Sequence, residues 1–198
     1  MELFICIMLI ILSYLMGNIS PSIILGKMQG IDIKSEGSGN AGTTNALRVL
    51  GAKAGLITFT MDIVKGFIPV FLAINLSTFY CAGVCVLMVI FGHIWPVIYK
   101  FKGGKGVATA IGATLAINPL LTLVITIFSI GMVAISKKVS VGSLTAAVIY
   151  PIATYIFMRD FMPFALILCL TIIIKHKENI KRLISGEEKN ISIRKKEK

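Results

Sequence analysis

The sequence has little charge, and negative charge is its scarcest kind. Only 15% of the 198 residues are charged, and 9 Asp and Glu stand against 20 Lys and Arg. With 56% apolar residues and a mean hydropathy of +0.89, the composition excludes an ordinary soluble domain and indicates an integral membrane protein. The basic residues cluster near the ends of apolar runs, so the net charge of +11 indicates membrane topology rather than nucleic-acid binding.

Cysteine and histidine are also scarce, with four and two residues respectively. The cysteines all lie in apolar runs, where they usually pack as small hydrophobic residues, so we expect no disulfide framework and no redox motif. They are Cys6, Cys81, Cys85 and Cys169. Because no group of His, Cys and carboxylate residues has metal-ligand spacing, we predict no metal and no cofactor.

The start of the chain lacks the features of a removable signal peptide. Glu2 precedes the first apolar stretch, where a basic region would be expected, and no small-residue cleavage signal follows that stretch. We therefore predict that the first segment is a permanent membrane span.

The apolar runs predict seven membrane-spanning helices, some of them short. The run 107–135 would reach about 43 Å as one helix, which is too long for an ordinary span, and Asn118-Pro119 interrupts it. We expect two short helices there, joined by a turn at Asn118-Pro119. The predicted spans are Leu3–Leu25, Leu56–Ile74, Phe79–Tyr99, the two halves of 107–135, Val141–Met158 and Phe161–Ile174.

Charge placement orients these spans. With seven spans the amino terminus lies outside, and Lys105, Lys137 and the basic carboxy-terminal segment lie in the cytoplasm, as the positive-inside tendency favours. A single helix across 107–135 would export that segment. Because no internal repeat is visible, we predict one all-α, multi-pass domain over 1–198 in the plasma membrane, with a mobile charged tail at 189–198.

Three polar stretches fall on the predicted cytoplasmic side. In the first, from Ser38 to Arg48, small residues let the backbone approach a ligand, and the Arg48 guanidinium suits a phosphate. The second, Gly103-Gly104-Lys105, stands before a helix whose first turn favours an anion. It is not a Walker loop, because Gly106 follows the lysine.

The third polar stretch runs from His176 to Glu188. His176, Asn179 and Arg182 follow helical spacing, so their side chains are expected to face one pocket. An imidazole, an amide and a guanidinium together can orient a phosphate or polarise a carbonyl. We therefore expect all three stretches to contribute to one cytoplasmic site for phosphate-bearing substrates.

These stretches resemble the motifs of the bacterial acyl-phosphate:glycerol-3-phosphate acyltransferase family. The family's first pattern, Ser-Gly-Asn-x-Gly-x-Thr-Asn-x-x-Arg, is complete, and its glycine-lysine and carboxy-terminal patterns are present, with Lys177 where arginine is common. The matching residues are Ser38, Gly39, Asn40, Gly42, Thr44, Asn45 and Arg48, then 103–109, then His176, Asn179, Ile180, Arg182, Leu183, Gly186 and Glu188.

The resemblance implies transfer of a fatty acyl group from acyl phosphate to the 1-hydroxyl of sn-glycerol 3-phosphate. The products would be lysophosphatidic acid and phosphate, in the first step of phospholipid synthesis, with the acyl chain held in membrane lipid. The candidate catalytic residues are Ser38, Arg48, His176 and Asn179. The candidate phosphate ligands are Asn40, Gly42, Thr44, Asn45, Gly103, Gly104, Lys105, Ser140 and Arg182. Either His176 or a substrate phosphate takes the hydroxyl proton.

Four further residues are candidates for orienting the pocket from behind. Asp62 and Lys65 lie one helical turn apart in a predicted span, which indicates an ion pair that is either purely structural or orients the pocket. His93 is either an interfacial anchor or a similar support. Glu188 is either a solvent-facing charge or a brace for Arg182.

A small transporter of an anionic metabolite is the main alternative, since charged residues inside a span can line a pathway. Three motifs at one membrane face, and no visible repeat, favour the enzyme. An acyltransferase with a His-x4-Asp pair is disfavoured, because Ile98 stands five residues after His93 and Lys181 five after His176.

Overall fold

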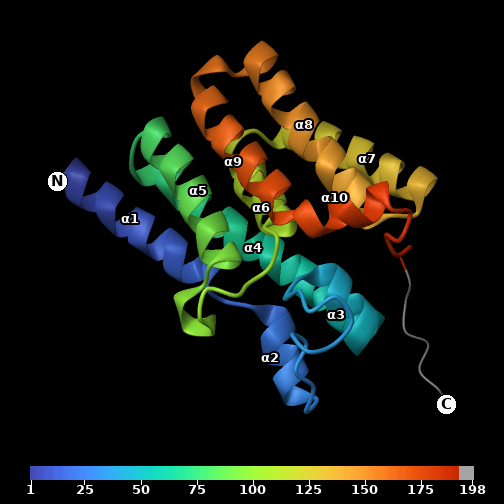
Figure 1. The fold of residues 1–198 in the computed structure, drawn as a ribbon. Helices are drawn as coiled ribbons and strands as arrows, with labels where there is room; N and C mark the ends of the chain where they lie inside the picture. Colours follow the sequence, from blue (N-terminus) through green and yellow to red (C-terminus); the bar gives the residue numbers. More distant parts are fainter. Residues whose placement is uncertain (192–198) are drawn as a thin grey trace. The chain divides into compact units, whose positions relative to one another are not determined.

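The computed structural model describes residues 1–191, and every regular element within them is a helix. Figure 1 shows the helices in chain order. The predicted all-α class is therefore confirmed for the described part of the chain. These residues form two compact units, unit 1 (residues 1–117) and unit 2 (residues 118–191). The predicted mobile tail falls largely on residues 192–198, which lie outside the described residues.

Unit 1 is built around the long helix α4 (Ala52–Leu76). This helix packs against α6 (Val107–Ile117), α3 (Thr43–Leu50) and α5 (Phe79–Ile94), and α5 packs along α1 (Glu2–Gly17). The remaining elements of the unit are α2 (Pro21–Met28) and the short 3-10 helix η1 (Val97–Tyr99).

Glycines set the closest helix contacts of unit 1. A Cβ atom added to Gly66 on α4 would overlap the Thr109 carbonyl oxygen on α6, and one added to Gly112 would overlap the Ile63 carbonyl oxygen. Small residues of this kind let membrane helices approach backbone to backbone. The middle of α4 is therefore pressed against the first turns of α6.

The first apolar segment, predicted as the spanning helix Leu3–Leu25, is two helices rather than one, although Glu2–Met28 as a whole is long and apolar enough to cross a membrane. Helix α1 ends at Gly17 and α2 begins at Pro21, with Asn18 to Ser20 between them. Proline restricts the residue before it to extended conformations, and Ser20 is extended (φ −116°, ψ 94°). The break leaves the backbone of Ile19 outside any helix, and its carbonyl oxygen accepts a hydrogen bond from Lys65.

Unit 2 contains the second half of the predicted 107–135 run. The expected turn is confirmed, because α6 ends at Ile117 and α7 (Pro119–Ser136) begins two residues later. The Asn118 side chain caps α7 by accepting from the Leu121 amide at 3.0 Å. The unit continues with α8 (Val139–Phe157), η2 (Arg159–Phe161), α9 (Met162–Lys175) and α10 (Lys177–Ile184).

Within unit 2, α8 packs against both α7 and α9. After α10 the chain returns to α7, and the Ile191 amide donates to the Lys137 carbonyl at 2.8 Å. The described start of the predicted tail is therefore bound to its own unit.

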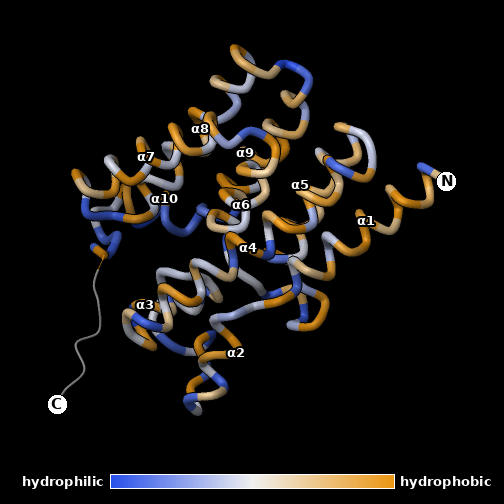
Figure 2. Tube along the Cα trace, turned by 180° about the vertical axis from the view of Figure 1, so that it is seen from behind, coloured by the Kyte–Doolittle hydropathy of each residue, from blue (hydrophilic) through white to orange (hydrophobic). Residues whose placement is uncertain are grey.

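Five helical segments are long and apolar enough to cross a membrane, and α6 is a shorter apolar helix. They are Glu2–Met28, Ala52–Leu76, Phe79–Tyr99, Pro119–Ser136 and Val139–Phe157. Figure 2 shows apolar colouring along these helices and hydrophilic colouring along much of α10. Length and composition thus support a multi-pass membrane protein, while the count of seven spans stays a prediction.

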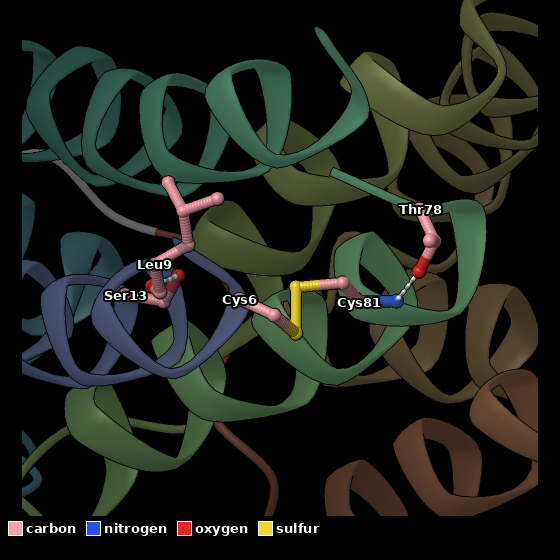
Figure 3. The surroundings of a disulfide bond; sticks show 5 residues. All are labelled: Cys6, Leu9, Ser13, Thr78 and Cys81. Carbon is pink, nitrogen blue, oxygen red and sulfur yellow. Dashed lines mark hydrogen bonds between the residues drawn. A yellow bond between two sulfur atoms is a disulfide. The ribbon is translucent and has the colours of Figure 1, made fainter. Parts of the chain in front are cut away.

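A disulfide joins α1 to α5 through Cys6 and Cys81 (Figure 3). The expectation that all four cysteines act as small hydrophobic residues is therefore wrong for this pair. The two Cα atoms are 5.9 Å apart, within the range that a disulfide spans. An apolar run does not reveal which faces of two helices meet, and this pairing depends on that contact. Cys85 and Cys169 are free thiols.

Candidate active site

Asn45 folds the first polar stretch. Its Oδ1 accepts from the Ser38 amide at 2.8 Å, and its amide nitrogen donates to the carbonyls of Ile33 and Glu36, both at 3.0 Å. The residue is buried in the first turn of α3. Because both amide hydrogens are used inside the protein, we interpret Asn45 as the residue that shapes the loop rather than as a phosphate donor.

The rest of this stretch leads into α3. Gly42 is the N-cap of the helix, Thr44 lies in its first turn, and Arg48 lies in its last turn with a half-buried side chain. Ser38 is exposed and Asn40 is half-buried. The first amides of a helix lack partners within the helix and favour an anion, so the loop and the start of α3 form a surface rich in donors.

Thr43 is a polar residue of this loop that the sequence did not single out. Its hydroxyl oxygen is buried and has no hydrogen-bond partner among the described residues. The family pattern leaves this position variable, so no motif could have identified it. A buried hydroxyl at the first position of α3 can donate to a ligand bound there.

The second polar stretch folds back onto the end of α5. The Gly103 amide donates to the Ile94 carbonyl, and the Gly104 amide donates to the His93 carbonyl, both at 3.1 Å. Gly106 then adopts a φ of +86°, which only glycine takes readily, and α6 begins at the next residue. Lys105 is half-buried within this turn.

Gly104 is the point where the two loops of unit 1 meet. A Cβ atom at this position would overlap Nε2 of His93 and would lie 3.1 Å from the carbonyl oxygen of Ala41. Gly104 therefore fits between the His93 ring and the first loop only because it has no side chain. The structure brings together two stretches that lie about sixty residues apart in the sequence.

A buried charged cluster lies behind this contact. Lys65 Nζ lies 2.7 Å from Asp62 Oδ1 and 2.9 Å from His93 Nδ1, and Asp62 Oδ1 lies 3.4 Å from the same ring nitrogen. The predicted Asp62–Lys65 ion pair is confirmed. His93 is 6% exposed, which does not fit a side chain anchored at the water interface.

The third polar stretch forms a separate cluster in unit 2, centred on Glu188. Its Oε1 accepts from the Ser140 hydroxyl and the Asn179 amide, both at 2.6 Å, and its Oε2 accepts from Arg182 Nε at 2.7 Å. Gly186 makes the turn after α10 with a φ of +77°, which returns Glu188 to the helix. Of the two interpretations of Glu188, the contact with Arg182 fits the brace and not the solvent-facing charge.

The electrostatics of this cluster favour the ionised carboxylate. Burial raises the pKa of Glu188, but the hydrogen bonds from Ser140, Asn179 and Arg182, together with the Arg182 charge, outweigh it, so the pKa lies below its ordinary value. The side chain is only 8% exposed. At neutral pH, Glu188 is therefore a fixed negative charge that holds three polar side chains.

His176 lies at the junction of α9 and α10 and is buried. Its Nδ1 lies 2.8 Å from the Ile172 carbonyl oxygen. Because a carbonyl only accepts, Nδ1 carries the hydrogen, and the neutral ring then has its lone pair on Nε2. In this tautomer, Nε2 is the ring nitrogen that can accept a proton.

The described residues contain no group of three or more His, Cys, Asp or Glu side chains that could hold a metal ion. Unit 1 thus carries the two glycine-containing loops and the Asp62–Lys65–His93 cluster. Unit 2 carries His176 and the Glu188 cluster. Each set contains hydrogen-bond donors, cations and one imidazole, together with one carboxylate that pairs with its own neighbours; the donors and cations suit the binding of anions, and an imidazole suits the transfer of a proton.

Comparison with known proteins gives consistent matches over nearly the whole chain. A family model described as glycerol-3-phosphate acyltransferase matches residues 7–186. The chain is 41% identical to the glycerol-3-phosphate acyltransferase of Clostridioides difficile (strain 630), with 98% of this chain and 100% of the relative covered. It is 42% identical to that of Staphylococcus haemolyticus (strain JCSC1435), over 93% of this chain and 97% of the relative.

Two solved structures are also similar. Both are crystal structures of PlsY (YgiH), described as an integral membrane glycerol 3-phosphate acyltransferase, at 34% sequence identity. The glycerol 3-phosphate form matches with a TM-score of 0.90 over 94% of this chain and 96% of that chain. The lysophosphatidic acid form matches with a TM-score of 0.87 over 93% and 94%.

Proposed function

Because the chain belongs to the glycerol-3-phosphate acyltransferase family, we propose that it transfers a fatty acyl group from acyl phosphate to the 1-hydroxyl of sn-glycerol 3-phosphate. The products are lysophosphatidic acid and inorganic phosphate, in the first step of phospholipid synthesis. The family match over residues 7–186, together with the complete first motif, is the observation that carries this proposal. Family membership also sets the transporter alternative aside.

Both substrates carry a phosphate, and the donors of unit 1 support binding of such groups. Arg48 and Lys105 supply positive charge, while Thr44 and the backbone amides beside Gly42 supply neutral donors. A hydrogen bond to a charged group contributes about 1.5 to 3 kcal/mol, so a few of them anchor a hydrophilic substrate firmly. We assign these groups to phosphate binding and Ser38 to the reacting end of a substrate.

His176, in unit 2, has the chemistry of a proton acceptor. In the reaction the glycerol oxygen forms a bond to the acyl carbon, the bond from that carbon to the phosphate oxygen breaks, and the hydroxyl proton leaves. The lone pair on His176 Nε2 fits it to take this proton, and a substrate phosphate is the alternative acceptor. Asn179 and Arg182, fixed by Glu188, suit the stabilisation of developing negative charge.

We propose seven spans, with the amino terminus outside and the motifs on the cytoplasmic side of the bacterial plasma membrane. Five long segments, the short helix α6 and the apolar α9 support this count. The Cys6–Cys81 disulfide supports the orientation, because it joins the early turns of α1 and α5, which then lie near the outer face. Disulfides persist in oxidising surroundings rather than in the cytosol.

The decisive test supplies the purified protein with glycerol 3-phosphate and one acyl donor at a time: acyl phosphate, acyl-CoA or acyl carrier protein thioester. We expect lysophosphatidic acid from acyl phosphate alone. Arg48→Ala should abolish it, whereas Arg159→Ala should not, because Arg159 lies over the Tyr155 ring outside the proposed machinery. Product from a thioester but not from acyl phosphate would overturn the donor assignment. No product from any donor would overturn the enzyme itself.

A further inference from the structure

We infer that His93 is a positioning residue for the reaction: its ring holds Gly104 and, through it, both anion-binding loops of unit 1, while Lys65 and Asp62 hold the ring. The inference rests on the proposed function, because it takes those loops to bind substrate phosphate. Its first support is the position of the ring, which lies between the charged cluster and Gly104.

One edge of the ring is fixed by Lys65. The Lys65 ammonium has three hydrogens, and it faces three acceptors: Asp62 Oδ1 at 2.7 Å, His93 Nδ1 at 2.9 Å and the carbonyl oxygen of Ile19. An ammonium only donates, so Nδ1 of His93 accepts. The ring is therefore held as the tautomer with its hydrogen on Nε2.

The other edge of the ring faces the loops. A Cβ atom on Gly104 would overlap both Nε2 and Cε1 of His93, and the Gly104 amide also donates to the His93 carbonyl at 3.1 Å. The same Cβ atom would also lie 3.1 Å from the backbone carbonyl oxygen of Ala41 in the first loop, so the His93 ring, Gly104 and the first loop meet at this point. A shift of the ring would thus shift Gly104 and the neighbouring Lys105, and would change the spacing of the two loops.

The burial of the cluster indicates that it acts indirectly. Asp62 is 1% exposed and Lys65 is 4% exposed, so neither side chain is available to a hydrophilic substrate. Charges inside a membrane span are costly and are rarely kept without a function. Holding one imidazole edge in a fixed place, directly behind two phosphate-binding loops, is a function that this geometry fits.

Two substitutions of His93 test the two edges of its ring separately. In His93→Asn the amide oxygen can replace Nδ1 as the acceptor for Lys65, but nothing remains beside Gly104. In His93→Gln the amide reaches the place of Nε2 beside Gly104, but Lys65 loses an acceptor. We expect the Asn variant to keep its melting temperature and to raise the KM of one phosphate substrate about tenfold, with a smaller change in kcat. The Gln variant should melt lower with a KM near that of the wild type.

Glycine substitutions test the contact directly. Gly104→Ala should raise the same KM, and combining it with His93→Asn should recover part of the loss, because the overlapping ring is gone and only the Ala41 contact at 3.1 Å remains. Gly103→Ala is the matched control. Its Cβ would overlap the backbone carbonyl oxygen of His93, which no side-chain change removes, so His93→Asn should not rescue it.

Suppose that the wild-type enzyme is active and that His93→Asn keeps the same melting temperature, KM and kcat. This result would overturn the inference and leave the proposed function intact. If His93→Asn fails to fold, Gly104→Ala decides: a raised KM at the wild-type melting temperature supports the inference, and an unchanged KM overturns it. A wild-type protein that forms no lysophosphatidic acid would instead overturn the proposed function.

Discussion

Unit 1 and unit 2 each hold a carboxylate among cationic and polar partners, but they bury it to different degrees. Asp62 lies inside a membrane-length helix and faces Lys65 and His93, with almost no exposure. Glu188 lies beyond the end of α10, and its partner Arg182 is 36% exposed. The same pairing chemistry thus occurs once in the interior of unit 1 and once beyond the end of a helix in unit 2.

The degree of burial decides how each cluster depends on its members. A buried charge that loses its partner cannot be solvated by water, so the cluster of unit 1 is fixed and strongly dependent on every member. The Arg182 side of the ion pair in unit 2 is partly exposed, and water and salt weaken such a pair, so we expect the cluster of unit 2 to tolerate single substitutions better. The crosslink between α1 and α5 adds further rigidity to unit 1 alone.

The largest effect is expected from Lys65→Met, which leaves Asp62 buried without its cation. Breaking a buried pair in this way costs about 3 to 5 kcal/mol, so the free energy of unfolding in detergent should fall by that amount. The double variant Asp62→Asn with Lys65→Met should recover part of it. Lys53→Met, at an exposed position at the start of the same helix, is the control and should change little. Equal stability of the Lys65 and Lys53 variants would contradict the contrast between the two units.

The second-largest loss of stability is expected when the disulfide is removed. Replacing Cys6 and Cys81 by serine should lower the free energy of unfolding by about 2 to 4 kcal/mol. Hydrogen exchange should report faster opening in α1 and α5, with α7 to α9 unaffected. Cys169→Ser in unit 2 is the matched control, because that thiol is free. Labelling of all four cysteines in denatured, unreduced protein would show that the crosslink does not form.

The features of this fold could be predicted from the sequence to different extents. The turn at Asn118 follows from a polar residue before a proline in an overlong apolar run, and the structure has it. The Asp62–Lys65 pair follows from the spacing of two charges on one helix. In both features the residues are close in the sequence, so their relative positions follow from the local structure and could be predicted.

Other features depend on which helix faces meet, and periodicity does not contain that information. The Cys6–Cys81 bond needs α1 and α5 side by side, and the Ile19 carbonyl meets Lys65 only because the first segment breaks before Pro21. The role of Asn45 was also hidden, because an amide in a phosphate-binding motif equally suits the folding of its own loop.

A smaller effect is expected from Glu188→Gln. This change removes a carboxylate that accepts three hydrogen bonds, and it should cost about 1.5 to 3 kcal/mol of stability at neutral pH. Glu178→Gln is the matched control, since Glu178 only approaches Lys181 at 3.8 Å on an exposed helix face, and a pair of this kind contributes at most about 1 kcal/mol.

The contribution of Glu188 to stability should also depend on pH. The folded-state pKa of Glu188 lies below its ordinary value despite burial, because of its hydrogen bonds and the Arg182 charge. Its contribution is therefore fully present above the unfolded-state pKa and is lost as the pH falls through the folded-state pKa. The stability gap between wild type and Glu188→Gln, followed by unfolding at several pH values, should close in acid. A gap that widens in acid would show that the pKa is raised instead.

The smallest loss of stability is expected from a substitution of Lys34. This variant tests whether the size of the loss depends on the burial of the residue or on the unit to which it belongs. Lys34 belongs to unit 1, but it is only half-buried, in a loop whose other residues are mostly exposed, with its ammonium 5.1 Å from the centre of the Tyr99 ring. Burial lowers the pKa of Lys34, and the charges of Lys102 and Lys27 lower it further against the opposing effect of Asp32. Lys34→Gln should lose a cation–π contact of about 0.5 to 1 kcal/mol, and relief of the lysine repulsion should offset part of it.

The net change for Lys34→Gln should therefore stay below about 1 kcal/mol and should vary with salt, as for the exposed Glu178–Lys181 pair of unit 2. Unfolding measured at low and at high ionic strength checks both points, with Lys65→Met as the salt-insensitive reference. A loss as large as that of Lys65→Met would mean that unit 1 is rigid throughout. A small, salt-dependent loss would mean that burial alone makes the Asp62 cluster different from the Glu188 cluster.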